Sequence, residues 1–560
     1  MSAKLNIVNT FENSTKKPIV FLMLIGLAGL ILRLVYFPYD VPLFNDSQGY
    51  FWYAIDMSIL NQLPYGHSVV NNGWPSFLSI IFQLMDSNNF LDYHNMQRFV
   101  GVVFSVATIF PVYFLCSMYF KKSYSLLGAT LFIFEPRLIQ NSFIGTPESM
   151  YIFLMALLLF LFLSNNFKKI YLAFGIVALL AITRYEGLLM IIPLSVVFFI
   201  RFRRQKKDLI KYIICISIFI LILIPVSSLR NETTGSDGFI SHISHGSKYY
   251  QAEIQENSSA FGDFLYLGSI NLIKYIGWAQ IPSFIIFIPL GIIFIFKKMD
   301  YKKSTIIFTI VVMLIPAFYA YSREFQEMKY LYVLYPIFCV LACFAFKIFL
   351  EKFHRRNLIF CIIIGGIILS SIIFVEWKAM DNEHYREAYE ILAEIGQKEM
   401  KINKELETYG GEFTYFSWVS LQNVDEFPIL KKELPPSKIT TTMRGESTRG
   451  WNEQLKQWNP DIGELELQES IDYHNTEIDN LRDYFQVLEK QKITHLLLDE
   501  INNSSLINDE LRLHLRDIFN HENKYPFLVK EYDSRENGFN YHVKLFKIDY
   551  DLYNEWINEN

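Results

Sequence analysis

A small set of ionisable side chains stands at the ends of long apolar runs, and these are the residues best able to do chemistry. The set consists of the acids Asp46, Glu148 and Glu186 and the cations Arg137, Arg184, Arg323 and Lys329. Charge this close to hydrocarbon is costly unless it is paired or functional. A carboxylate here could serve as a general base, and the cations could bind a lipid phosphate. The simpler alternatives are helix capping by the acids and structural ion pairs with Glu186 or Glu324.

Two of the acids stand at predicted helix starts. Asp46 opens the stretch 46–60, in which apolar residues recur at helical spacing, so we predict a helix that lies in the membrane interface and carries Tyr50 in its second turn. Glu148 follows Thr146-Pro147, and this pair is typical of the beginning of a helix. As simpler alternatives, Asp46 would only cap its helix and Glu148 would only be a first-turn acid on the helix dipole.

Two further features lie close to these acids. Arg137 is about one and a half turns inside an apolar run, where it needs an anionic partner such as Glu135 or the phosphate of a ligand. Between the predicted helix 46–60 and the next apolar run, Asn71-Asn-Gly73-Trp74-Pro75 combines turn residues with a Trp, which we predict to anchor at headgroup depth.

The elements that position these residues follow from composition. The chain is 52% hydrophobic and 16% aromatic, which is too apolar for a soluble protein of 560 residues. Residues 1–375 carry 30 Lys and Arg against 19 Asp and Glu, whereas residues 376–560 carry 21 against 37. This division predicts a membrane domain at 1–375 and an acidic soluble domain at 376–560, and it excludes a basic nucleic-acid binder. The five cysteines all lie in apolar runs, so neither a disulfide framework nor a zinc site is expected.

Apolar runs long enough to cross a bilayer occur eleven times, so we predict a polytopic helical membrane protein of about 11 transmembrane helices with a C-terminal α/β domain. The runs are approximately 18–37, 98–120, 125–142, 149–164, 170–183, 187–201, 209–229, 277–296, 304–320, 330–349 and 357–375. Those between 125 and 201 are short or closely spaced, and a merged or re-entrant pair there would change the count.

Lys and Arg are distributed unevenly between the connecting loops. Basic residues gather in alternate loops, including 121–122, 168–169, 201–207 and 297–303, whereas the long loop 38–97 contains no Lys or Arg. Because basic loops remain in the cytosol, we predict a cytosolic N-terminus and an extracytoplasmic domain at 376–560. All the ionisable residues singled out above then lie toward the outer face.

The acidic C-terminal part has the pattern of a small α/β domain. A helical pattern begins at Tyr385, and Phe413–Val419 and Ile493–Asp499 are predicted as buried strands. Phe527–Tyr532 and Tyr541–Ile548 are predicted as a hairpin joined by an Asn-Gly turn at Asn537-Gly538. No nucleophile, metal or phosphate motif occurs in this part, so we expect it to recognise the acceptor or to stabilise the protein.

The sequence resembles the GT-C class of integral-membrane glycosyltransferases, particularly the protein O-mannosyltransferases and the related lipid-linked sugar transferases such as aminoarabinose transferases. The resemblance covers most of residues 18–375. It rests on these features: Asp46 with Tyr50 and Ala54, Gly73-Trp-Pro75, Pro147-Glu148, Arg184-x-Glu186, and Arg323 to Lys329-Tyr330 followed by Pro336. It departs from the family pattern at Ser47, where many members have a second acid, and at Lys329, where an Arg is common.

The resemblance implies a polyprenyl (dolichyl)-phosphate sugar donor and a catalytic carboxylate at Asp46. Phosphate leaves as a stable anion, so transfer to an acceptor hydroxyl needs a base and cations more than an acid. In-line attack with Asp46 as base would invert the sugar. Glu148 is the second candidate catalytic residue, and the donor would be bound by Tyr50, Arg137, Arg184, Glu186, Arg323 and Lys329. The acceptor could be protein, lipid or glycan, and a divalent metal shared by Asp46 and Glu148 stays open.

A secondary transporter or lipid flippase is the main alternative, because such proteins also place ionisable residues in their spans. Transporters tend to carry that charge near the midplane, whereas here it gathers at one surface, which favours an enzyme. An oligosaccharyltransferase is less favoured, because residues 376–560 lack the expected Trp-Trp-Asp-Tyr-Gly signature.

Overall fold

The computed structural model of the chain describes residues 16–398, 406–409, 481–490, 495–500 and 509–559, apart from gaps at 42, 44–45, 65–70, 88–89, 203–205, 236, 243, 245–259, 298, 324, 326 and 353–355. It divides into two compact units. The helical unit comprises Met1–Phe37, Val69–Leu78 and Met96–Trp377. The second unit comprises Pro38–Ser68, Ser79–Asn95 and Lys378–Asn560. The predicted strand at 413–419 and the predicted partner Glu324 lie outside the described residues.

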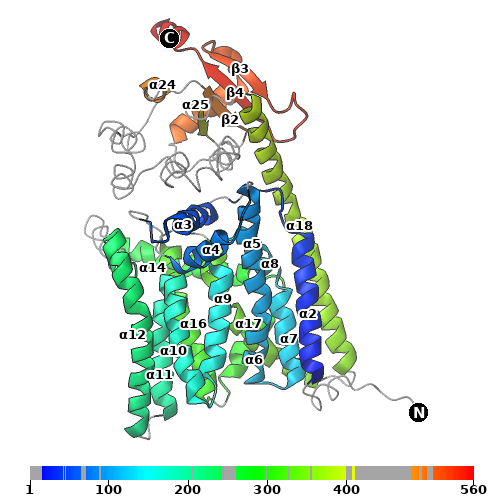
Figure 1. The fold of residues 1–560 in the computed structure, drawn as a ribbon. Coiled ribbons are helices and arrows are strands. Elements are labelled where there is room, and N and C mark those ends of the chain that lie inside the picture. Colours follow the sequence, from blue (N-terminus) through cyan, green and yellow to red (C-terminus); the bar gives the residue numbers. More distant parts are fainter. Residues whose placement is uncertain are drawn as a thin grey trace. The chain divides into compact units, whose positions relative to one another are not determined.

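The helical unit consists of membrane-length and shorter helices that run side by side (Figure 1). They are α2 (Lys16–Val35), α5 (Phe90–Ala107), α6 (Ile109–Ser117), α7 (Lys122–Ile133), α8 (Pro136–Ile144), α9 (Glu148–Phe162), α10 (Phe167–Thr183), η1 (Tyr185–Met190), α11 (Ile191–Phe202), α12 (Lys206–Thr234), α14 (Ala260–Ala279), α15 (Phe287–Ile295), α16 (Tyr301–Ser322), η2 (Met328–Leu334), α17 (Tyr335–Glu351) and α18 (Arg356–Lys398). Of these, α5 and α18 extend into the second unit.

Seven stretches of the described residues are helices long and apolar enough to cross a membrane. They are Lys17–Val35, Leu91–Ser117, Tyr185–Phe202, Asp208–Thr233, Tyr301–Ser322, Met328–Glu351 and Leu358–Ala379. Each overlaps one of the predicted runs, so the multi-pass membrane architecture is confirmed. The other four predicted runs correspond to shorter or interrupted helices, and a total of eleven crossings stays a prediction.

The apolar helices differ in how much of their surface is covered by protein. In the most apolar window of Met328–Glu351, 78% of the residues are buried, against 11% for Asp208–Thr233. The helix α17 is therefore central to the unit, and α12 is peripheral with its apolar face left for lipid.

The predicted run 125–142 is broken into α7 and α8 at Glu135-Pro136. Pro136 is the first residue of α8, and Glu135 before it has extended backbone angles, φ −71° and ψ 114°. A proline lacks the N–H of a continuing helix and disfavours helical angles in the preceding residue. The guanidinium of Arg33, fully buried, donates to the Ile133 carbonyl at 3.0 Å and so satisfies the freed end of α7.

The predicted run 277–296 is also interrupted, but by a longer segment than the run 125–142, and its helices begin and end at other residues than predicted. The helix α14 begins at Ala260 and ends at Ala279, and α15 begins only at Phe287. The prediction of one continuous span from 277 is therefore wrong. The segment from Gln280 to Ile286 separates the two helices, and Pro282 within it cannot donate a helical hydrogen bond.

The Lys- and Arg-rich connections between helices, which are called the basic corners below, lie together at one end of the helical unit. Arg201 donates to the carbonyls of Phe162 at 2.9 Å and Ser164 at 2.7 Å, and its guanidinium lies 4.4 Å from the Tyr301 ring centroid. Lys302 donates to the Met118 carbonyl at 2.9 Å. The corners predicted to share a side from their Lys and Arg content therefore do share one.

The second unit contains helices of the segment 38–95 and a small sheet domain at its C-terminal end. The sheet domain confirms a C-terminal α/β fold. The helix α3 (Asp46–Leu60) has the predicted bounds. The sheet order is β1-β2-β4-β3, with β1 (Leu406–Tyr409) parallel to β2 (His495–Asp499), and with β4 (Val543–Ile548) antiparallel to both β2 and β3 (Leu528–Asp533). Its helices are α24 (Leu481–Lys490), α25 (Asp509–Asn520), η5 (Glu522–Lys524) and α26 (Tyr550–Glu559).

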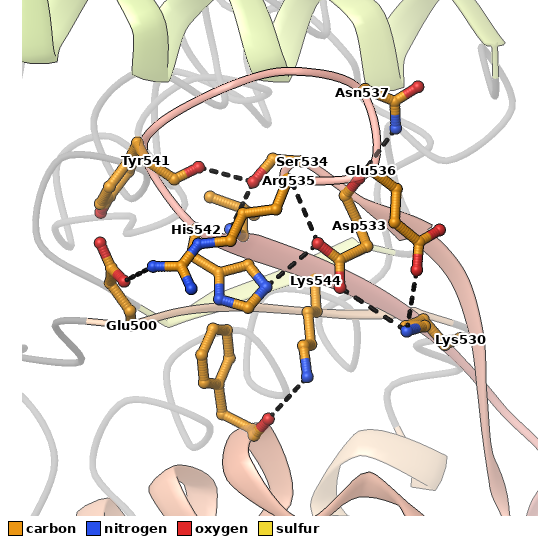
Figure 2. Close-up of polar contacts among 12 residues, drawn as sticks. Glu500, Lys530, Asp533, Ser534, Arg535, Glu536, Asn537, Tyr541, His542 and Lys544 are labelled. Atoms are coloured by element: carbon orange, nitrogen blue, oxygen red, sulfur yellow. Dashed lines mark hydrogen bonds and ion pairs between the residues drawn. The ribbon is translucent and has the colours of Figure 1, made fainter.

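The hairpin β3–β4 is confirmed, but its turn is longer than the predicted Asn-Gly pair. Residues 534–542 connect the strands, and Gly538 adopts φ 89°, a left-handed conformation that favours glycine. The buried Ser534 hydroxyl donates to the Tyr541 carbonyl at 2.5 Å and accepts from the Val543 N–H at 2.8 Å. These bonds close the base of the loop (Figure 2).

A buried carboxylate stands at the same loop base. Asp533 accepts from the His542 ring nitrogen at 3.0 Å and lies 3.6 Å from the Lys530 ammonium (Figure 2). Burial by itself raises the pKa of Asp533, but the hydrogen bonds from His542 and the Arg535 N–H, with the charges of His542 and Lys530, outweigh it and hold that pKa below its usual value.

A pH dependence of the hairpin follows from this lowered pKa. A carboxyl that is more acidic when folded stabilises the fold above its unfolded pKa of about 3.9, and this contribution is lost as pH falls through the folded pKa. Asp533→Asn should therefore raise amide hydrogen exchange across 528–548 at pH 7, after correction for intrinsic rates. The difference from the native chain should vanish near pH 2. An equal difference at both pH values would show that charge plays no part.

Candidate functional site

The first part of the candidate site is the corner between α8 and α9. The helix α8 ends at Ile144 and is followed by Gly145, whose φ of 84° is left-handed. Pro147 then leads into α9, with Glu148 as its first residue. Glu148 is buried, with 3% of its surface exposed. The predicted helix start at Thr146-Pro147 is therefore confirmed, and it directs a carboxylate into the protein rather than into water.

The second part is the corner between α10 and η1. Arg184 has extended backbone angles, φ −147° and ψ 126°, which end α10 and allow η1 to begin at Tyr185. Gly187 is required here, because a Cβ at this position would lie 2.6 Å from the Leu180 carbonyl carbon. Arg184 and Glu186 are both buried in this corner.

Ion pairs join the two corners. The Arg184 guanidinium binds Glu186 with two parallel bonds, Nη2 to Oε1 at 2.7 Å and Nε to Oε2 at 3.3 Å, and its Nη1 binds Oε1 of Glu148. Such bidentate, charge-assisted contacts are strong and geometrically specific. The three residues are called the carboxylate–arginine cluster below. The structural ion pair with Glu186, which the sequence left as an alternative, is thus present.

The cluster carries one cation against two carboxylates when all three groups are ionised. The rings of Tyr151 and Tyr330 lie 5.9 Å from the Arg184 guanidinium carbon. Among the described residues, Oε2 of Glu148 and the Tyr151 hydroxyl have no hydrogen-bond partner although both are buried. Buried polar atoms are rarely left unsatisfied. The cluster therefore offers a free acceptor and a hydroxyl to a ligand or to water.

The segment Asn71–Trp74, read from the sequence only as a turn and an anchor, contacts both corners. The indole N–H of Trp74 donates to the Gly145 carbonyl at 2.9 Å, and the Tyr185 N–H donates to the Asn71 side-chain oxygen at 3.2 Å. Trp74 is fully buried by protein, so it is not an anchor that contacts lipid headgroups, and its depth in the membrane stays a prediction. The indole N–H donates to a buried carbonyl, and this hydrogen bond replaces the one that the N–H would make to water.

Two further polar residues at this corner were missed by sequence reasoning. Gln97 donates to the Gly145 carbonyl at 2.7 Å, and Arg98 donates to the Phe143 carbonyl at 2.9 Å. Both are buried in α5, and they satisfy carbonyls that the end of α8 leaves without partners. The available signal was the Gln97-Arg98 pair at the start of an otherwise apolar run.

The remaining cations predicted to bind phosphate are not members of the cluster, although Lys329 and Arg184 both lie 5.9 Å from the ring centroid of Tyr330. Arg137 donates from Nε to the Ile281 carbonyl at 3.1 Å, and its guanidinium lies 5.5 Å from the Phe374 ring centroid. A carbonyl and a ring thus contact Arg137, for which Glu135 or the phosphate of a ligand was the expected partner. The ammonium nitrogen of Lys329 lies 2.5 Å from Oε2 of Glu327. Arg323 directly follows Ser322, the last residue of α16.

Asp46 and Tyr50 lie on α3, in the second unit. Asp46 is the first residue of that helix and is exposed, and Tyr50 is partly buried. The helix begins with a carboxylate at its positive end, which is favourable for the helix dipole. Within the described ranges, no group of three or more His, Cys, Asp or Glu side chains is arranged to hold a metal ion.

Residues 76–228 match a family of proteins described as dolichyl-phosphate-mannose-protein mannosyltransferases. This segment includes the whole carboxylate–arginine cluster. No match was found among curated proteins.

Among solved structures, an archaeal oligosaccharyltransferase has a similar fold. The apo Archaeoglobus fulgidus oligosaccharyltransferase has a TM-score of 0.53 at 14% identity, covering 87% of this chain and 70% of that one. The archaeal oligosaccharyltransferase AglB from Archaeoglobus fulgidus, in complex with an inhibitory peptide and a dolichol-phosphate, has a TM-score of 0.53 at 13% identity, covering 94% of this chain and 74% of that one. ArnT from Cupriavidus metallidurans, bound to undecaprenyl phosphate, has a TM-score of 0.42 at 10% identity, covering 94% and 97%.

At this identity the likeness to the oligosaccharyltransferase concerns the fold, and it leaves the acceptor untested. The family match adds the activity class, because it falls on the helices that carry the cluster. Together, the matched segment and the fold indicate that the chain is a multi-pass membrane glycosyltransferase of the GT-C class.

Proposed function

We propose that this protein transfers a sugar from a polyprenyl-phosphate donor to an acceptor hydroxyl at the outer membrane face. The observation that carries the proposal is the family match over residues 76–228, because its family uses a dolichyl-phosphate-linked sugar and its bounds enclose the buried cluster. One similar archaeal oligosaccharyltransferase structure holds a dolichol-phosphate, and another is tethered to an acceptor peptide, which supports a lipid-linked donor and a protein acceptor.

The chemistry that we propose needs one base and several cations. Asp46 takes the proton from the acceptor hydroxyl, whose oxygen attacks the anomeric carbon as the bond to the lipid phosphate breaks. The phosphate leaves as a stable anion, so no acid is required. Direct displacement inverts the anomeric configuration. A positioned base of this kind contributes about 10²–10⁴-fold to the rate.

The charge of the carboxylate–arginine cluster suggests how the binding roles divide. One cation against two carboxylates disfavours an anion, so we assign the phosphate to Arg137, Arg323 and Lys329. The cluster instead binds a hydroxyl group, which donates a hydrogen bond to Oε2 of Glu148. Arg184 holds that carboxylate in place, Glu186 holds Arg184, and Tyr50 contacts the donor.

The proposal is tested with purified protein in detergent or vesicles, supplied with radiolabelled polyprenyl-phosphate sugars and Ser- or Thr-containing peptides. Label that moves from lipid to peptide supports it, and NMR of the product should show the inverted anomeric centre. Movement of intact lipid or of a solute between leaflets, with no transfer of sugar, would favour the transporter or flippase instead.

We also propose that the basic end of the helical unit is cytosolic. The contacts of Arg201 and Lys302 gather the Lys- and Arg-rich corners at that end, as the distribution of charge in membrane proteins favours. In a chain with Cys361→Ser, a cysteine at exposed Met299 should react with a membrane-impermeant maleimide only after cells are opened. A cysteine at exposed Asp86 should react in intact cells. The reverse pattern would invert the proposed topology.

A further inference from the structure

We infer that the segment Asn71–Trp74 is a positioning clamp that sets the geometry between the two corners of the carboxylate–arginine cluster. The inference rests on the proposed function, because it assigns the clamp a role in transfer. None of these four residues belongs to the cluster itself. Each contact described below lies within the helical unit.

At the first corner, the clamp fixes where α9 begins. The Gly145 carbonyl accepts from both Trp74 and Gln97, which uses both of its lone pairs. Arg98 holds the preceding turn through the Phe143 carbonyl. Only Thr146 and Pro147 separate Gly145 from Glu148, and proline restricts the backbone between them. A displacement of Gly145 must therefore move the Glu148 carboxylate.

At the second corner, the same segment holds the backbone that carries Arg184. A Cβ at position 73 would lie 2.9 Å from the Cα and N atoms of Thr183, so glycine allows the two backbones to touch. The Asn71 side chain accepts from the Tyr185 N–H. Asn72 accepts from Arg230, which is buried in α12. The residues on both sides of Arg184 are thus in contact with the clamp.

The clamp and the ion pair form a closed circuit of contacts. Arg184 joins its corner to Glu148 directly, and Asn71–Trp74 joins the same two corners through their backbones. The side chains in the circuit are buried or half-buried, so they are held with little freedom. Effective transfer depends on such fixed geometry, since small displacements of a binding group reduce rates strongly. Trp74 is therefore a positioning residue that acts through Glu148.

The first test measures amide hydrogen exchange by mass spectrometry in the full-length protein. Trp74→Phe removes one donor to the first corner and keeps an aromatic ring, and Asn71→Ala removes the acceptor at the second corner. Each variant should raise exchange about fivefold to tenfold at both corners, 143–149 and 184–190, as the loss of one hydrogen bond predicts. Effects confined to the variant's own corner would overturn the inference, because the segment would then be two independent caps.

The second test separates positioning from loss of stability. If Trp74 acts through Glu148, Trp74→Phe should lower kcat about tenfold in the native background and by less than twofold in Glu148→Gln. An equal loss in both backgrounds would contradict the inference. Thr130→Val is the matched control, because it removes a buried, local 2.9 Å bond within α7 and should leave kcat unchanged.

The two tests also distinguish this inference from the proposed function. If the native chain transfers no sugar from any lipid-phosphate donor, the proposed function fails. Raised exchange at both corners would still support the clamp as a structural link. If transfer occurs but exchange at the opposite corner is unchanged, the clamp fails and the proposed function stands.

Discussion

Asp46→Asn should reduce sugar transfer by about 10²–10⁴-fold, the contribution of a positioned general base. The amide has almost the same size and cannot take a proton from the acceptor hydroxyl. It also preserves much of the start of α3, where loss of the charge costs only about 0.3–1 kcal/mol through the helix dipole. We expect the loss in kcat rather than in the yield of folded protein. Single-turnover transfer of labelled sugar measures it.

Asp92→Asn is the matched control for this variant. Asp92 is another exposed acid of the segment 38–97, in the first turn of α5, and it accepts from the Ser87 hydroxyl. It should keep near-native transfer. If Asp46→Asn also transferred sugar at the native rate, Asp46 would not be the base, and the role would have to pass to another carboxylate.

Arg184→Met should destabilise the protein by about 3–5 kcal/mol and abolish transfer. Removal of one partner from a buried ion pair leaves uncompensated charge, and here it leaves the two carboxylates of Glu148 and Glu186 without their shared cation. Both acid side chains are at most 5% exposed, so water cannot replace the guanidinium. Retention of monodisperse protein after heating in detergent reports the loss of stability.

A triple variant separates stability from chemistry at the same place. Arg184→Met combined with Glu148→Gln and Glu186→Gln removes all three charges, and neutral replacement of a complete buried ion cluster is often tolerated. Heat resistance should return to within about 1–2 kcal/mol of the native protein. Transfer should stay about tenfold to 100-fold reduced, because the carboxylate of Glu148 no longer accepts a hydrogen bond from the bound hydroxyl group. Recovery of transfer would show that the cluster only supports the fold.

The sequence predicted single elements well wherever the nearest residues decide the structure. The bounds of α3, the strand β2, the hairpin β3–β4 and the start of α9 at Glu148 follow from spacing, turn residues and proline. The helix α18 was predicted as a span followed by a separate helical pattern, and it is continuous to Lys398. The broken run at Glu135-Pro136 was also a local effect, which a stricter use of the proline rule would have found.

The sequence could not predict which charged residues become partners. Arg184 was expected to bind a lipid phosphate, but it binds Glu148. Glu148 lies 36 positions away in the sequence, and the two side chains come into contact only because α9 and α10 pack side by side. The burial of Trp74 likewise depends on where the Gly145 corner lies, 71 positions further along the chain. Such contacts depend on packing between helices, and residue type and spacing do not encode packing.

The sequence by itself determined the class of this protein. The thickness of the hydrocarbon fixes the length of an apolar helix, and the cost of moving Lys and Arg across it biases the loops, so both leave a direct record in composition. The tertiary structure alone decided that two acids share one arginine, and that the four residues Asn71–Trp74 connect their corners. The physical reason is that an ion pair in a low dielectric requires its partners to be brought together by the fold, which no local pattern records.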